Sequence, residues 1–280
     1  MTPLLGLSRR RRRHLAGGAA LVTGASSGVG RAVALELARR GVRVFATARR
    51  GDRLAALADE ATARGLHPIR HEAGDITIAD VRRRLVSNAV DALGGLDIVV
   101  AAAGSGAVGP FRASSADTLA RIMDVDFFAP AELVRDALPS LLRSTDPAIV
   151  LVGSILGHHP LPMHAEYCAA KAALTSLATC LRLELAADGV DVLLASLGPT
   201  TSEFWDHLLA GRRAEWSRGR PLSAERTARI MVRALVWRRR EVLPGWRAKG
   251  FAWAARLFPR LIDRALARKL RRRPPDRATP

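Results

Sequence analysis

The sequence predicts an α/β protein in which a doubly wound parallel sheet lies between two layers of helices, a single-domain three-layer α/β/α architecture. Three observations indicate this fold. Short apolar runs of strand length alternate with longer segments of helical length. The runs are apolar at nearly every position, as expected for strands buried on both faces of a parallel sheet. The chain has 280 residues, 49% of them hydrophobic, which is enough for one large core.

Seven segments are expected to form the strands, because each is short, largely apolar and bounded by turn or helix signals. The third contains Pro68, which has no N–H to donate to a neighbouring strand. The segments are Ala19–Thr23, Val42–Ala46, His67–His71, Ile98–Ala102, Ile149–Val152, Val190–Ala195 and Glu241–Leu243.

Helical periodicity predicts helices at Arg31–Arg40, Ala116–Arg143 and Glu166–Ala187. The last two are partly apolar all round, which favours burial against a neighbouring subunit in a homodimer or homotetramer. The domain is expected over residues 18–245. A basic extension (1–17) precedes it, a basic amphipathic tail (246–280) follows it, and a lid without strand pattern lies at about residues 200–222.

A glycine-rich loop joins the first strand to the first helix. Glycines there allow a tight turn and a close approach of the backbone to a diphosphate, and the helix N-terminus adds free N–H groups. An ordinary strand-to-helix turn is the alternative, and the position directly after the first strand argues against it. The loop reads Thr23-Gly24-Ala25-Ser26-Ser27-Gly28-Val29-Gly30.

A candidate reaction centre is formed by Ser154, Tyr167 and Lys171. Tyr167 and Lys171 are four residues apart and share one helix face, where a nearby ammonium lowers the cost of forming a phenolate. Tyr167 is the only tyrosine of the chain, and Lys171 is one of three lysines beside 41 arginines. In a chain so rich in arginine, a lysine at this position indicates a specific need for its compact ammonium.

The loop spacing and this Ser-Tyr-Lys set resemble the short-chain dehydrogenase/reductase family, from about Ala19 to Gly245. The resemblance implies a Rossmann-type fold and an NAD(P)-dependent oxidoreductase that interconverts a carbonyl and a secondary alcohol. It makes Tyr167 the general acid/base and assigns Lys171 to the nicotinamide ribose. It also makes Ser154 the group that orients the reacting oxygen.

The resemblance also implies which residues hold the cofactor. The family's selecting position at the end of the second strand carries no acid, and Arg49 there favours NADP(H) over NAD(H) because a guanidinium can grip a phosphate; one more surface arginine is the alternative. Asp75 is expected to bind the adenine, or simply to form a turn. The full set is Gly24, Ser26, Ser27, Gly28, Val29, Gly30, Arg49, Asp75, Ile76, Ala103, Gly104, Tyr167, Lys171, Gly198 and Thr200.

One candidate catalytic position departs from the family. Asp126 stands where the family has an asparagine that holds a proton-relaying water. Its charge is expected to raise the pKa of Lys171 and to alter the pH dependence of the reaction.

All five tryptophans lie between Trp205 and Trp253, which favours an apolar cavity for a hydrophobic small molecule; packing in a core or dimer interface is the alternative. The tail repeats arginine at positions 256, 260, 264 and 268 beside apolar residues, a pattern that predicts peripheral contact with an anionic membrane, or a solvated face.

The net charge of +18 lies largely near the two ends of the chain and comes without zinc-knuckle spacing or interleaved aromatics, so we expect no nucleic-acid partner. Cys168 and Cys180 are about 18 Å apart along one helix and cannot pair, which favours a cytoplasmic location. No metal site is expected. A non-catalytic dinucleotide-binding protein and an NAD-dependent alcohol dehydrogenase remain the alternatives.

Overall fold

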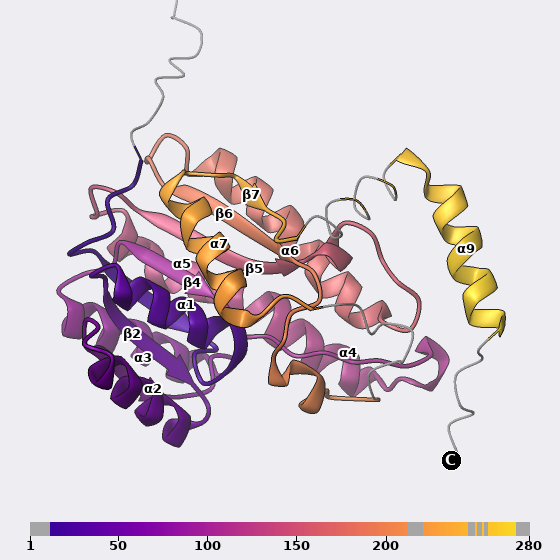
Figure 1. The fold of residues 1–280 in the computed structure, drawn as a ribbon, viewed down its shortest axis with the longest axis horizontal. Helices are drawn as coiled ribbons and strands as arrows, with labels where there is room; N and C mark the ends of the chain where they lie inside the picture. The colour runs from indigo at the N-terminus through magenta and orange to yellow at the C-terminus, as the bar shows by residue number, and fades with distance from the viewer. Residues whose placement is uncertain (1–11, 212–220, 246–249, 251–253, 255–256, 273–280) are drawn as a thin grey trace, which may run out of the picture.

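A computed structural model describes residues 12–211, 221–245, 250, 254 and 257–272. Its centre is a seven-stranded parallel sheet in the order β3-β2-β1-β4-β5-β6-β7 (Figure 1). All seven predicted strands are present, with ends displaced by a few residues. They are β1 (Ala19–Thr23), β2 (Arg43–Ala48), β3 (Ile69–Ala73), β4 (Ile98–Ala101), β5 (Ala148–Ser154), β6 (Asp191–Leu197) and β7 (Glu241–Val242).

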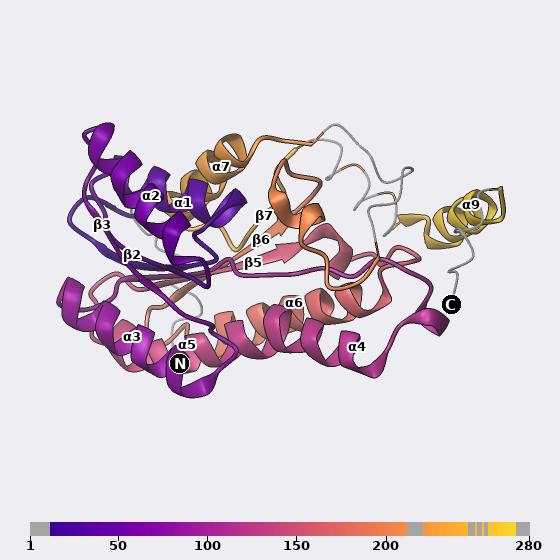
Figure 2. The ribbon, with the colours of Figure 1, turned by 90° about the horizontal axis from the view of Figure 1, so that it is seen from below.

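Helices cover both faces of the sheet (Figure 2). One layer contains α1 (Gly28–Arg39), α2 (Gly51–Ala63) and α7 (Ala224–Val236), and the other contains α3 (Ala79–Leu93), α4 (Ala116–Met123), α5 (Ala129–Leu141) and α6 (Ala165–Glu184). Neighbouring strand residues supply opposite cores: in β1, Val22 packs into the first layer and Leu21 into the second. This alternation explains why the central strands β1, β4 and β5 are apolar at nearly every position.

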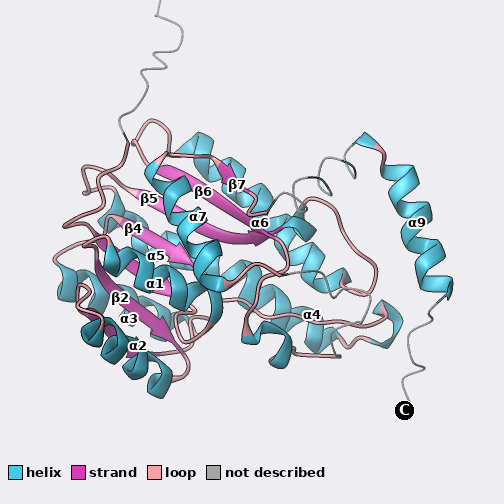
Figure 3. Ribbon diagram, in the orientation of Figure 1, coloured by secondary structure: helices cyan, strands magenta, loops and turns pink. Residues whose placement is uncertain are grey.

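The strand order reverses direction between β1 and β4, so the loops after these two strands diverge and leave room for a ligand. Because all strand pairs are parallel, the loops that follow β1, β4, β5 and β6 meet at one edge of the sheet (Figure 3). The chain also forms short helices at η1 (Phe111–Ala113), η3 (Ile155–Gly157) and η4 (Glu203–Asp206), and the tail contains α9 (Pro259–Arg272).

The helix expected over Ala116–Arg143 is confirmed as one helical stretch that ends at Leu141 and contains a local change of winding. A π-helical segment, η2 (Asp124–Phe128), separates α4 from α5. A π-helical turn contains one more residue than an α-helical turn, and this changes the direction in which the inserted side chains point. Hydrophobic periodicity predicts the helical stretch but does not detect this local change within it.

An ionic cluster ties the segment before β1 to the amino-terminal ends of β5 and β6. The buried guanidinium of Arg13 lies 2.7 Å from Asp191 and 3.1 Å from Asp146, and Arg238 contacts the same two carboxylates. Arg13 therefore belongs to the folded body. The preceding arginines, 9–11, lie outside the described residues.

Cys168 and Cys180 both lie on α6 as free thiols. Over the ranges that the structure describes, no helix is long and apolar enough to cross a membrane. In the same ranges no group of side chains has the arrangement of a metal site.

Candidate active site

One cavity of about 600 Å³ lies at the carboxyl edge of the sheet, and every residue predicted for the site lines it. It therefore brings together segments that are far apart in the sequence. The residues predicted to bind the cofactor are present there: Gly24, Ser26, Ser27, Gly28, Val29, Gly30, Arg49, Asp75, Ile76, Ala103, Gly104, Gly198 and Thr200. The catalytic candidates Asp126, Ser154, Tyr167 and Lys171 line the same cavity.

The glycine loop is shaped to accept a diphosphate. Gly24 and Gly28 have φ values of 65° and 55°, a conformation that side chains rarely adopt. A Cβ on Gly24 would lie 2.7 Å from the backbone nitrogen of Ala103, and one on Gly30 would lie 2.4 Å from the carbonyl oxygen of Gly24. The N-terminus of α1 has no side-chain cap, so its N–H groups face the cavity edge and fit an anionic ligand.

The two arginines after β2 lie in different surroundings. Arg49 is exposed and makes no hydrogen bond or ion pair with the part of the chain that the structure describes. Arg50 donates hydrogen bonds to the hydroxyls of Ser26 at 3.1 Å and Ser27 at 2.8 Å, and to Glu203 at 3.0 Å. Sequence reasoning missed Arg50, and the only signal for it was its place in the Arg49-Arg50 doublet.

Other residues of the predicted cofactor site are held by local hydrogen bonds. Asp75 accepts bonds from the backbone N–H and the hydroxyl of Thr77, at 3.0 and 2.7 Å, so this carboxylate forms a turn as well as lining the cavity. The hydroxyl of Thr23 accepts from the backbone nitrogens of Ala102 and Ala103 at 3.1 and 3.3 Å. This contact holds the loop after β4 against the end of β1, beside the glycine loop.

Ser154, Tyr167 and Lys171 converge at the centre of the cavity. Ser154 is the last residue of β5, and its hydroxyl accepts a hydrogen bond from the backbone N–H of Leu156 at 3.1 Å. Tyr167 and Lys171 lie one turn apart on α6, with the lysine nitrogen 5.7 Å from the centre of the tyrosine ring. The spacing of four residues therefore places both groups on the cavity face of the helix.

The pKa of Tyr167 is raised above its ordinary value. Burial is the largest cause and the charge of Asp126 adds to it, while Lys171 and a hydrogen bond with Ser154 act in the opposite direction. The sequence predicted that Lys171 would favour the phenolate. Lys171 does so, but burial outweighs it and favours the phenol over the phenolate.

Asp126 forms a buried ion pair with Lys171. Their charged atoms are 2.8 Å apart, and the side chains are 0% and 5% exposed. The lysine also donates to the carbonyl of Val152 at 3.2 Å, and the carboxylate accepts from the backbone N–H of Ser105. Burial favours a lower pKa for Lys171, but Asp126 and Tyr167 raise it overall, the direction expected from the sequence. Burial raises the pKa of Asp126 itself.

The end of the cavity beyond Tyr167 is apolar and aromatic. The ring of Phe204 lies 5.7 Å from that of Tyr167 and 5.3 Å from that of Trp205, and Trp205 meets the ring of His164 edge-on at 6.5 Å. Aliphatic side chains complete this wall: Val108, Leu161, Leu208, Leu209 and, from α9, Leu266.

Only one of the five tryptophans, Trp205, lines this cavity within the described residues. Trp237 instead stacks against the guanidinium of Arg12 at 3.7 Å. The other three, at positions 216, 246 and 253, lie outside the residues that the structure describes.

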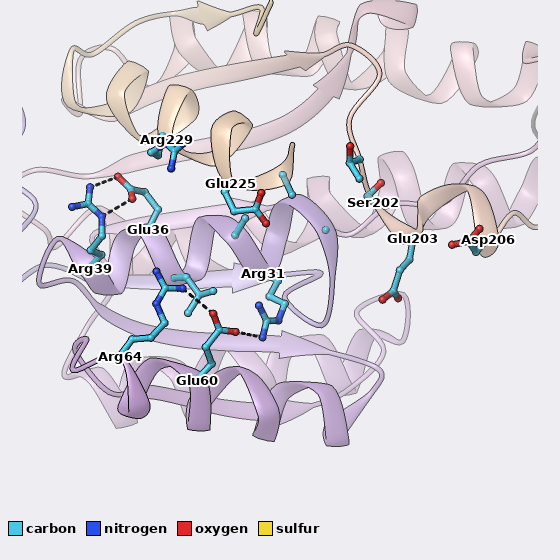
Figure 4. Close-up of a pocket in the computed structure, with 15 residues that line it drawn as sticks. Arg31, Glu36, Arg39, Glu60, Arg64, Ser202, Glu203, Asp206, Glu225 and Arg229 are labelled. Carbon is cyan, nitrogen blue, oxygen red and sulfur yellow. Dashed lines mark hydrogen bonds and ion pairs between the residues drawn. The ribbon is translucent and has the colours of Figure 1, made fainter. Parts of the chain in front are cut away.

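A second cavity, of about 750 Å³, lies beside the first, between α1, α2, α7 and η4 (Figure 4). Its walls are charged, and most of the charges neutralise one another: Glu60 pairs with both Arg31 and Arg64, and Glu36 pairs with Arg39. Glu203 lines both cavities and therefore lies on the wall between them.

Comparison with known proteins gives a consistent result. Residues 18–213 match the family model described as short chain dehydrogenase. An "Uncharacterized oxidoreductase" of Myxococcus xanthus is 41% identical over 187 residues, which cover 66% of this chain and 72% of that protein.

A second relative and a solved structure extend the similarity. "Hydroxysteroid 11-beta-dehydrogenase 1-like protein A" of Xenopus laevis is 32% identical over 251 residues, or 88% of this chain and 84% of the relative. The crystal structure of a short chain dehydrogenase/reductase from Burkholderia phymatum in complex with NAD superposes with a TM-score of 0.77 at 24% identity, covering 89% and 96% of the two chains. At that identity the superposition shows the shared fold alone.

Proposed function

This chain belongs to the short-chain dehydrogenase family, and from that premise we propose that it is an NADP(H)-dependent oxidoreductase that interconverts a carbonyl and a secondary alcohol on a hydrophobic small molecule. The observation that carries the proposal is the single cavity in which the glycine loop, Ser154, Tyr167 and Lys171 meet. The glycine loop supports binding of the cofactor, and Ser154, Tyr167 and Lys171 support the reaction.

The residues of the cavity fit a dinucleotide. The glycine loop and the uncapped end of α1 would hold its diphosphate, and Asp75 and Ile76 would lie against the adenine. Ala103, Gly104, Gly198 and Thr200 continue the wall toward Lys171, which would hold the nicotinamide ribose. When bound, the nicotinamide supplies or accepts the hydride.

In the proposed reaction Tyr167 transfers the proton and Ser154 orients the substrate oxygen. The phenol of Tyr167 can donate its proton to a carbonyl oxygen, and burial, which raises its pKa, favours this protonated form. This favours operation as a carbonyl reductase. The ammonium of Lys171 stabilises the phenolate that remains after the donation, and Asp126 fixes that ammonium in place.

Two arginines and the absence of an acid at the end of β2 support NADP(H) over NAD(H). Arg49 is exposed and uncommitted within the described chain, and Arg50 lies on the cavity wall beside Ser26 and Ser27. Both could pair with a 2′-phosphate. The Burkholderia structure, which contains NAD, keeps the NAD-dependent alternative open for the experiment below.

The aromatic and aliphatic end of the cavity supports a bulky hydrophobic substrate. Phe204 and Trp205 face the centre beside Tyr167, and aliphatic side chains close the remaining sides. A lipid, steroid-like or polyketide carbonyl has the matching chemistry.

A non-catalytic dinucleotide-binding protein is the second candidate, and Asp126 is the observation that favours it. A carboxylate paired with Lys171 at 2.8 Å replaces the neutral amide of the family and competes for the lysine's hydrogen bonds. Binding of dinucleotide without Tyr167-dependent turnover would support this candidate.

Two surfaces support further parts of the proposal. Leu119 and Phe128 are exposed on the α4 and η2 segments, which suits a homo-oligomer contact and can be checked by light scattering after size exclusion. Leu257, Phe258 and Leu261 are exposed beside the arginines of α9, which suits peripheral contact with anionic vesicles at low salt. The free cysteines fit a cytoplasmic location.

The deciding experiment is a screen of apolar ketones and secondary alcohols, monitored by the absorbance of the reduced cofactor, with NADPH and NADH tested separately. Tyr167→Phe serves as the blank, and we expect it to lose about 10²–10⁴-fold in turnover. Turnover that persists in Tyr167→Phe would contradict the mechanism. Equal turnover with NADH would contradict the cofactor assignment.

A further inference from the structure

Glu203 of the short helix η4 reaches across the cavity edge to the arginines that follow β2. Its carboxylate lies 3.0 Å from Arg50 and 3.4 Å from Arg53, although about 150 residues separate them in the sequence. His207, one turn further along, lies 3.3 Å from the same Arg50 guanidinium. These contacts link the lid segment to the cofactor end of the cavity.

Arg50 uses its donors on two kinds of partner. Some N–H groups bind the hydroxyls of Ser26 and Ser27 in the glycine loop, and another binds the Glu203 carboxylate. A guanidinium binds carboxylates and phosphates through the same planar set of donors. A phosphate that approached Arg50 would therefore compete with Glu203 for the same N–H groups, and the two anions would repel each other.

We propose that Glu203 is an intramolecular competitor for Arg50, so that a 2′-phosphate on the cofactor binds by displacing the Glu203 carboxylate and thereby shifts η4. The proposal rests on the proposed function, since it presumes a dinucleotide in this cavity. It assigns discrimination between phosphorylated and unphosphorylated cofactor to the Arg50–Glu203 pair, in addition to Arg49.

The exposure of the pair makes such an exchange feasible. The Arg50 and Glu203 side chains are 34% and 36% exposed, and exposed ion pairs of this kind contribute little to stability because water and salt screen them. The contacts of a phosphate with Arg50 and with the serine hydroxyls can exceed that small contribution, because charge-assisted bonds to a dianion are stronger than those to a screened carboxylate.

The same helix forms the substrate wall. Phe204 and Trp205 directly follow Glu203, and the Phe204 ring lies 5.7 Å from the ring of Tyr167. Ser202, just before η4, packs on the glycine loop so closely that a Cβ on Gly28 would lie 2.9 Å from its own Cβ. Displacement of Glu203 would therefore move side chains at the reaction centre, and cofactor and substrate sites would be coupled.

The test is calorimetric binding of two probes that differ by one phosphate, adenosine 2′,5′-bisphosphate and 5′-AMP, to the full chain. Glu203→Gln removes the competing charge, and Asp206→Asn is its matched control. Asp206 is a carboxylate on the same helix and lines the charged cavity (Figure 4). Within the described structure no hydrogen bond or ion pair joins it to Arg50. Arg50→Gln and Arg49→Gln separate the two arginines.

We expect Glu203→Gln to tighten binding of the bisphosphate by roughly three- to tenfold and to leave 5′-AMP binding unchanged. Asp206→Asn should change neither by more than about twofold. Arg50→Gln should weaken binding of the bisphosphate and should abolish the effect of Glu203→Gln in the double variant.

Three results would overturn the inference: Glu203→Gln behaves like Asp206→Asn, it tightens both probes equally, or its effect survives in Arg50→Gln. If the wild type prefers the bisphosphate and only Arg49→Gln removes that preference, the inference fails while the NADP(H) assignment stands. If the wild type shows no preference but Glu203→Gln acquires one, the competition holds and the NADP(H) assignment fails.

Coupling to the substrate wall has its own readout, the quenching of Trp205 fluorescence by acrylamide, taken as the difference between the wild type and Trp205→Phe. The bisphosphate should change this quenching and 5′-AMP should not. An equal response to both probes would show that the wall does not respond to the 2′-phosphate and would overturn the coupling through Glu203.

Discussion

Two ion pairs of nearly equal length lie in the same cavity and have different surroundings. The charged atoms of Lys171 and Asp126 are 2.8 Å apart with side chains 5% and 0% exposed, while those of Arg50 and Glu203 are 3.0 Å apart with side chains 34% and 36% exposed. The distance between the charged atoms therefore does not distinguish a pair that stays closed from one that opens. The exposed fraction of the side chains does, because it determines how strongly water and salt screen the charges and how much it costs to leave one charge without its partner.

The comparison suggests a division of tasks. Lys171 and Asp126 lie between α6, the π-helical segment and the loop after β4, where both side chains are almost completely buried. This suits a reaction centre that has to keep one geometry. The exposed pair of Arg50 and Glu203 can open at low cost, which suits a site that exchanges a carboxylate for a ligand.

The largest expected effect is the loss of Lys171. In Lys171→Met the carboxylate of Asp126 stays buried without its partner, and we expect the free energy of unfolding to fall by about 3–5 kcal/mol in urea titrations. Without the lysine, Asp126 will take up a proton on folding because burial raises its pKa. The loss should therefore be small at acidic pH and grow as pH rises through that raised pKa.

The double variant Lys171→Met with Asp126→Asn is the control, because it leaves neither charge buried. It should recover most of the lost stability. A Lys171→Met protein as stable as the wild type near neutral pH would show that the pair is not desolvated as the structure indicates.

Removal of the Ser154 hydroxyl should affect catalysis more than binding. Ser154→Ala deletes a preorganised donor at the oxygen that gains charge, and we expect turnover to fall roughly 10²–10³-fold. Cofactor affinity should stay unchanged, since the glycine loop and Arg50 are untouched. Steady-state kinetics and calorimetry separate the two; a loss confined to cofactor binding would remove Ser154 from the reaction centre.

Replacement of Asp126 by asparagine should move the pH profile without abolishing activity. The charge of Asp126 adds to burial in raising the pKa of Tyr167, so Asp126→Asn lowers that pKa toward its ordinary value. Alcohol oxidation needs the phenolate and carbonyl reduction needs the phenol. Therefore the acidic limb of oxidation and the alkaline limb of reduction should both move to lower pH in profiles of kcat/KM. Unchanged limbs would contradict the role given to Asp126.

The surroundings of Lys171 and those of Arg50 also differ in how far the sequence predicted them. Ser154, Tyr167 and Lys171 could be predicted because each is defined by local order: a strand end, or two positions one turn apart on a helix. The role of Arg50 depends on Glu203, 153 positions later, and hydrophobic patterns carry no information on such a contact.

The same limit explains two features that the sequence did not predict. The π-helical segment Asp124–Phe128 leaves the apolar pattern of the surrounding helices almost unchanged, so the pattern predicts the helix and not the π-turn inside it. The sequence predicted the effect of Lys171 on the pKa of Tyr167 in the right direction, but it did not show the burial that outweighs this effect. Both features depend on three-dimensional surroundings, whereas the strands followed from short and mostly apolar runs.

The smallest effect is expected for Arg53, which lies near Arg50 where the 2′-phosphate is proposed to bind. Arg53 also contacts Glu203, but at 3.4 Å and with its side chain 51% exposed, and it makes no contact with the serines of the glycine loop in the described chain. Arg53→Gln should therefore change the free energy of unfolding by less than about 0.5 kcal/mol and the affinity for adenosine 2′,5′-bisphosphate by less than about twofold. Raising the salt concentration should erase even this difference, since water and ions already screen the pair. An effect of Arg53→Gln as large as that of Arg50→Gln would mean that the whole basic segment after β2 attracts the phosphate by its summed charge, and that the hydrogen bonds of Arg50 to Ser26 and Ser27 do not single it out.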